Sequence, residues 1–151
     1  MKSPLLFAAL ALSLCLPAAP VGRAAEPEHK KKAEETELGN TMEKMNGAWR
    51  KLKKQAGDAT NNAASLALVA TMKACAEKAL TLKPARAEDV PAAGRADFVA
   101  DYQKDMKEFV SLVGELEKAF QAGDNAAAQA LIQKMGAAQK EGHKEFKRPD
   151  L

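Results

Sequence analysis

The sequence contains few aromatic residues and few cysteines, and both shortages restrict how a core can be built. Phe, Trp and Tyr make up 5% of the 151 residues, so a flat ligand could supply core volume that the side chains do not. Of the two cysteines, only Cys75 lies outside the N-terminal segment. A single cysteine forms no intramolecular disulfide, so packing, a cofactor or both must hold the core together. We expect Cys75 to pack as a small apolar residue or, if exposed, to allow disulfide-linked dimers.

The sequence also lacks the patterns of several large protein classes. It has no phosphate-binding loop, no GxSxG nucleophile motif and no paired carboxylates on one helical stripe. The predicted helical stripes carry no Glu-x-x-His motif of the di-iron type. No apolar run reaches the roughly 20 residues that a membrane-spanning helix needs, and no segment alternates with the period of a β-strand. We therefore expect a helical protein that does not span a membrane.

The charge balance does not indicate nucleic-acid binding. The sequence has 23 basic and 20 acidic residues, with a formal net charge of +3. Removal of Lys2 and Arg23 with the expected signal peptide leaves 21 basic residues and a net charge of +1. A nucleic-acid-binding domain would show a strongly basic face. The lysine-rich runs at residues 30–32 and 51–54 are expected to be solvated, or to form a docking patch for an acidic redox partner.

Residues 1–24 have the pattern of a secretory signal peptide. Lys2 precedes an apolar run at residues 5–16, and Pro17 then breaks any helix. Cleavage after Ala24 fits the small-residue positions of such a site best. A lipoprotein signal through Cys15 is the alternative, but the bulky Leu14 stands where such signals have a small residue.

The expected mature chain consists of a charged tail at residues 25–35 and one domain at residues 36–151. The tail has no apolar stripe and carries His29, which we expect to be solvated rather than to bind a metal.

Four helices are predicted from the spacing of apolar residues and from the residues that interrupt them. Their predicted ranges are 37–56, 63–82, 95–122 and 126–147. We expect Asn61 or Asn62 to cap the second helix. The link at residues 83–94 contains two prolines and a glycine, so we expect it to be irregular. Short links after the first and third helices favour antiparallel neighbours. The predicted fold class is all-α, an up-down-up-down antiparallel four-helix bundle.

Met42 and His143 are expected to lie at similar depth in this bundle. Met42 follows the start of the first helix by ~8 Å, and His143 precedes the end of the last by ~6 Å. Both are predicted to point inward at the same end, where a thioether and an imidazole match the axial ligands of haem in an electron-transfer cytochrome. Taken separately, Met42 is better explained as a core residue and His143 as a surface residue near a helix end, so neither alone supports a ligand role.

The expected mature sequence resembles the cytochrome b562 family over nearly its full length. The matching segments are residues 38–46 (LGNTMEKMN), 62–79 (NAASLALVATMKACAEKA), 109–116 (FVSLVGEL) and 137–146 (AAQKEGHKEF). The resemblance implies that Met42 and His143 stand at the family's haem ligands and that Phe109 packs on the haem. It also implies a four-helix bundle that holds one noncovalent haem b (iron protoporphyrin IX) and carries electrons in the periplasm.

On this interpretation the iron has six ligands and no open position, so we expect an electron carrier and not an enzyme. The metal ligands are Met42 and His143, and the pocket wall is formed by Phe109, Met45, Met106 and Met135. We expect a periplasmic monomer whose partners are unidentified periplasmic redox proteins. A methionine–histidine ligand pair raises the reduction potential, because a thioether favours Fe(II).

Three positions depart from the family pattern. Gln139 replaces an arginine that the family often has, Gly142 replaces an aromatic residue before the histidine, and Asp105 replaces a second haem-facing phenylalanine. Some relatives attach haem covalently through cysteines near this histidine, but this sequence has none there and no CxxCH motif. The departures motivate an alternative, a periplasmic four-helix-bundle binding or structural module that holds no haem.

Overall fold

The computed structural model describes residues 36–149, and the expected signal peptide and charged tail lie outside these residues. The four long helices are α1 (Glu37–Gln55), α2 (Asn62–Ala79), α3 (Arg95–Gln121) and α4 (Asn125–Phe146). Three short 3-10 helices lie in the connections: η1 (Ala59–Asn61), η2 (Ala85–Asp89) and η3 (Ala92–Gly94). No strand occurs within residues 36–149. No helix in this part of the chain is both long and apolar enough to cross a membrane.

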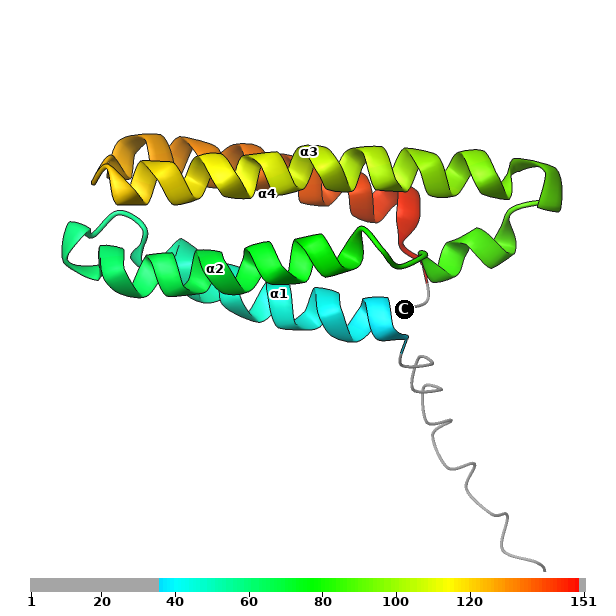
Figure 1. The fold of residues 1–151 in the computed structure, drawn as a ribbon, viewed down its shortest axis with the longest axis horizontal. Coiled ribbons are helices and arrows are strands. Elements are labelled where there is room, and N and C mark those ends of the chain that lie inside the picture. Colours follow the sequence, from blue (N-terminus) through cyan, green and yellow to red (C-terminus); the bar gives the residue numbers. More distant parts are fainter. Residues whose placement is uncertain (1–35, 150–151) are drawn as a thin grey trace, which may run out of the picture. The chain divides into compact units, whose positions relative to one another are not determined.

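Consecutive helices run antiparallel, which confirms the predicted up-down-up-down bundle (Figure 1). α1 lies beside α2 and α3 beside α4, and α2 packs against α3. Both short connections lie at one end of the bundle, which we call the closed end. The start of α1, the end of α4 and the long α2–α3 connection lie at the other, which we call the open end (Figure 1). α1 therefore begins at the open end, and α4 ends there.

Polar side chains join the first and last helices at the closed end. Asn61 occupies the N-cap position of α2, one of the two positions predicted, but its side chain makes no capping hydrogen bond. The Asn62 and Asn125 amides instead exchange hydrogen bonds of 3.2 and 2.8 Å. Asn125 Nδ2 also donates to the carbonyl of Ala56 at 2.8 Å. These side-chain amides hold the start of α4 against the end of α1. Such a tertiary contact cannot be predicted from the neighbouring residues in the sequence.

The α2–α3 connection is more regular than the sequence indicated. α2 ends at Ala79, three residues before its predicted end, because tighter i→i−3 bonds from Thr81 and Leu82 replace the α-helical pattern. This tightening precedes Pro84, whose ring disfavours helix in the residue before it. The chain then forms η2 and η3 rather than an irregular loop.

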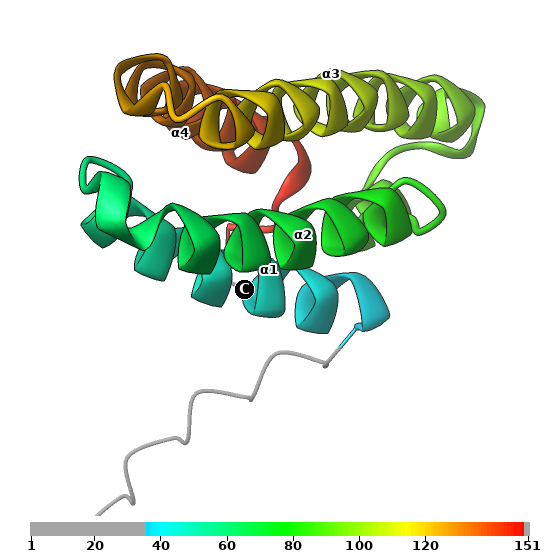
Figure 2. The ribbon, with the colours of Figure 1, turned by 60° about the vertical axis from the view of Figure 1, so that its left-hand side comes forward.

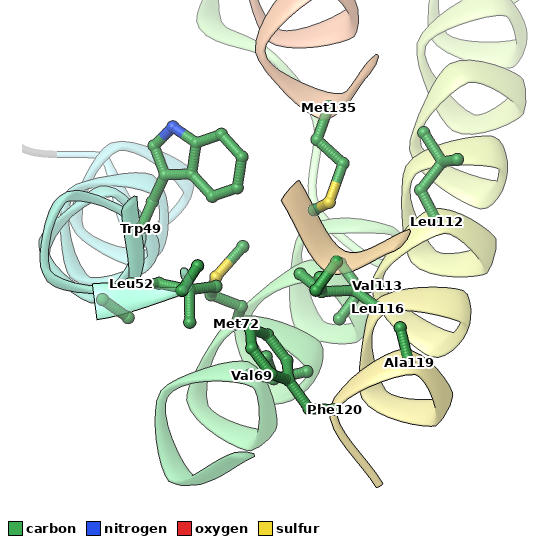
Figure 3. Packing of buried hydrophobic residues seen from close by; sticks show 13 residues of the cluster. Trp49, Leu52, Val69, Met72, Leu112, Val113, Leu116, Ala119, Phe120 and Met135 are labelled. Atoms are coloured by element: carbon green, nitrogen blue, oxygen red, sulfur yellow. The ribbon is translucent and has the colours of Figure 1, made fainter. Parts of the chain in front are cut away.

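Two groups of buried side chains form the core. The main cluster includes the fully buried Leu52, Met72, Leu116, Phe120 and Met135, and Figure 3 shows how side chains from all four helices meet there. The open-end cluster consists of Ala76, Ala79, Tyr102, Met106 and Phe146. Cys75 is 5% exposed, which confirms the prediction that it packs as an apolar residue.

Candidate functional site

The seam between α1 and α4 is the loosest boundary in the bundle. The backbones of α1 and α2, of α2 and α3, and of α3 and α4 approach closely along their lengths, whereas those of α1 and α4 do not. Turning the bundle shows the two helices in separate layers (Figure 2). Side chains bridge the seam deep in the bundle, where Trp49 of α1 faces Met135 of α4 (Figure 3).

Towards the open end the seam lacks buried side chains. In α4 no residue between Met135 and Phe146 is buried. In α1 the only buried residue before Ala48 is Thr41, whose hydroxyl bonds the carbonyl of Glu37. A methyl group added at Gly142, directly before His143, would meet no atom within 4 Å. The two facing helix surfaces are therefore less covered than an interior at normal packing density would be.

The structure brings most of the predicted site residues together at this open end. Met42, Met45 and Phe109 are half-buried and pack against the open-end cluster. Met106 belongs to that cluster and is 8% exposed. Met135 is different, because it is fully buried in the main cluster, although Met45 and Phe109 also border that cluster. Met42, Met45 and Met106 thus belong to the open-end cluster or border it, whereas Met135 lies in the main cluster.

His143 lies on α4, one turn before Phe146 of the open-end cluster. It precedes Phe146 by three residues, and the Phe146 ring packs edge-on against Phe98 and Tyr102 with centroid separations of 5.3 and 5.5 Å. His143 itself is exposed, so the expected inward orientation is not accompanied by burial. Partial desolvation lowers the pKa of its imidazole below the ordinary value, and the positive charge of Lys147 lowers it further. Both effects favour the neutral ring, the form that binds metals.

Tyr102 provides the polar anchor of the open-end cluster. Its hydroxyl donates to the carbonyl of Ala79 at 3.1 Å and so ties α3 to the end of α2. Burial raises the pKa of Tyr102 to about 12, so the phenol stays neutral at physiological pH. Tyr102, Phe98 and Phe146 were not assigned to the site from the sequence. The three-residue spacing of Phe146 from His143 was the available signal.

Trp49 marks the inner end of the seam with an unusual feature. Its ring is 4% exposed, yet the indole N–H has no hydrogen-bond partner among the described residues. In Figure 3 this nitrogen points away from Leu52 and Phe120. Most buried donors in folded proteins are paired, and an unpaired one is typical of a site that water or a ligand completes. The seam thus has an exposed imidazole on α4, a half-buried thioether on α1 and one buried donor without a partner among residues 36–149, which are side-chain types that suit a flat, largely apolar ligand with a metal.

Two of the residues that depart from the family pattern, Asp105 and Gln139, are free to be replaced without loss of a hydrogen bond among residues 36–149. Asp105 is exposed on α3, and the neighbouring Met106 takes the buried position instead. Gln139 is half-buried on α4, one turn before His143. Neither side chain makes a hydrogen bond within residues 36–149, so neither holds a competing structural contact at the seam.

The comparisons agree with the geometry. The family model described as Cytochrome b562 matches residues 37–147, which is most of the chain and all four helices. No curated protein gives a significant match to the sequence.

Proposed function

The chain belongs to the cytochrome b562 family of haem-binding electron-transfer proteins, and we propose that it binds one b-type haem noncovalently in the α1–α4 seam. Met42 and His143 are the proposed axial ligands. Phe109, Met45, Met106 and Met135 are the proposed wall. We also propose that residues 1–24 export the protein to the periplasm, where it exchanges single electrons with other redox proteins as a monomer.

One observation supports the proposal most directly. Met42 of α1 packs against the open-end cluster, and His143 of α4 precedes Phe146, a member of that cluster, by three residues. Both lie on the two neighbouring helices whose backbones stand apart. The protein would need to supply only the iron ligands that the porphyrin lacks, and Met42 and His143 are side chains of the types that haem proteins use for this.

Each residue at the seam has its own proposed role in haem binding. When bound, haem supplies a one-electron Fe(III)/Fe(II) couple. Met42 would hold the iron through its sulfur, a ligand that favours Fe(II) and would raise the potential. His143 would hold it as the neutral imidazole, the form that its lowered pKa favours. Met45 and Phe109, which border both clusters, would exclude water from the haem, and the exposed side at His143 would leave a short path for electrons to a partner.

A haemin titration of the mature protein followed by reduction tests this proposal. We expect a saturable one-to-one change and sharp low-spin bands on reduction. His143→Ala should remove the low-spin bands, and Met42→Ala should open a coordination position and lower the potential. His29→Ala is the matched control, because His29 is the only other histidine. Met72→Leu is the control for methionine, because Met72 is fully buried in the main cluster. Both controls should leave the spectrum unchanged.

The second candidate is a bundle that has kept the fold without haem. The exposure of His143 and the replacements at Asp105, Gln139 and Gly142 favour it. In that case the haemin spectrum would stay broad and would not saturate, while circular dichroism still showed intact helices. The same titration therefore separates an electron carrier from a binding or structural module.

A further inference from the structure

Residues 84–90, which we call the strap, bind the end of α4 across 58 residues of sequence. The strap contains η2 and lies at the open end (Figure 1). Its Arg86 side chain donates from Nη1 to the carbonyls of Lys144 and Glu145, at 2.9 and 2.6 Å. One guanidinium therefore pairs two carbonyls that directly follow His143 in sequence.

A second contact joins the strap to the residue just beyond α4. Arg148 donates from Nε and Nη2 to the two carboxylate oxygens of Asp89, both at 2.8 Å. Such two-point pairs fix direction as well as distance. The strap is held in turn by Arg95 at the start of α3, which donates to the carbonyls of Val90 and Glu88 at 2.8 and 3.0 Å. The end of α4 is thus connected through the strap to α3.

These contacts act on the helical turn that most needs them. The last carbonyls of an α-helix have no partner within the helix, and the last turn frays unless other groups pair them. In α4 the His143 carbonyl accepts from Lys147 N at 3.1 Å, and Arg86 pairs the next two. A cation at a helix C-terminus also interacts favourably with the helix dipole. On the inner side, only Phe146 anchors this turn in the core.

We propose that the strap positions His143 for the iron, with Arg86 and Asp89 as the positioning residues. The inference rests on the proposed haem function. The open seam explains the need for such a device, because α1 gives this turn of α4 little backbone support. Exposed ion pairs contribute little to global stability, so the main effect of the strap is local, at the turn that carries the ligand.

The test compares Arg86→Ala, Arg86→Lys and Lys83→Ala in the full mature chain. Lys83 is an exposed cation beside the strap and serves as the matched control. Each variant is titrated with haemin, and hydrogen exchange of the amides of residues 143–147 is measured before haemin is added. We expect Arg86→Ala to raise the Kd about tenfold, the effect of losing a charged hydrogen bond. It should also leave a high-spin fraction at saturating haemin and speed exchange in residues 143–147 alone. Arg86→Lys should have a Kd between those of the wild type and Arg86→Ala, because an ammonium lacks the forked donors of a guanidinium.

A second arm separates positioning from general destabilisation. In a His143→Ala background, Arg86→Ala should cause no further change in the haem spectrum, because the ligand that the strap positions is gone. An equal loss of affinity in both backgrounds would overturn the inference, and so would wild-type affinity and spin state in Arg86→Ala. Failure of the wild type itself to give low-spin bands would instead refute the haem function, and the inference with it.

Discussion

At the scale of single residues, His143 should make haem binding sensitive to pH. Its pKa lies below the ordinary value of 6.5, so the folded protein favours the neutral ring. In the unfolded chain the ring binds a proton at higher pH. The stability linked to His143 is therefore present above pH 6.5 and is lost as the pH falls through the lower folded pKa. Because iron and the proton compete for the same nitrogen, haem affinity should fall about tenfold per pH unit below that pKa.

A His29→Ala variant makes this prediction directly measurable, because it leaves His143 as the only histidine. Nuclear magnetic resonance of its ring protons gives the folded pKa, and haemin titrations at the same pH values give the affinity. A folded midpoint at or above 6.5 would contradict the desolvation and the Lys147 repulsion seen in the structure.

Residue identity at the site was partly predictable from sequence. Met42 and His143 stay predictions, made because the bundle topology and the family resemblance point to the same two residues. The exposure of His143 was not predictable, because it depends on how far α4 stands from α1. Arg86 and Asp89 gave no local signal either, since their partners follow 58 and 59 residues later.

At the scale of elements, the turn between α3 and α4 depends on Gly123. This residue has φ +70°, where a Cβ is unfavourable. Asp124 N bonds the carbonyl of Ala119 and Gly123 N that of Phe120, which completes a Schellman motif. We expect Gly123→Ala to lower the free energy of unfolding by about 1 kcal/mol, measured by urea denaturation.

Gly114 gives the matched control in the helix that precedes this turn. It lies in the interior of α3, and a methyl group there would meet no atom within 4 Å. Gly114→Ala should raise the free energy of unfolding by up to about 1 kcal/mol through helix propensity. Equal effects of the two substitutions on the free energy of unfolding would mean that the turn does not require a glycine at position 123.

Helix positions were predicted to within three residues because apolar spacing and breaking residues are local signals. The predicted ends of α1, α3 and α4 lie within one residue of the observed ends. The end of α2 was predicted three residues too late, since Leu82 continues the apolar stripe although the backbone has already tightened ahead of Pro84. The 3-10 helices were missed because they are too short to show a period.

At the scale of the whole bundle, stability and ligand binding should be separable. The main cluster carries the largest fully buried side chains, and the asparagine contacts lock the closed end. The proposed ligands lie at the open end, where burial is poorest. Met42 and Leu52 are ten residues apart on α1, about 15 Å along the axis. Substitutions at such separations usually add independently.

We therefore expect Leu52→Ala to lower the free energy of unfolding by about 2–5 kcal/mol, because Leu52 is fully buried and its truncation leaves a cavity. Met42→Ala, at a half-buried residue, should cost less in the haem-free protein. Free haemin at about 100 times its Kd should stabilise the wild type and Leu52→Ala equally, by about 2.7 kcal/mol. At the same free haemin concentration, Met42→Ala should be stabilised by less. Thermal and urea unfolding with and without haemin measure the free energy of unfolding of each variant and its change on binding. If Leu52→Ala kept its helices but lost the haem-linked stabilisation, the two clusters would be coupled, and the open end would depend on core packing well beyond the seam.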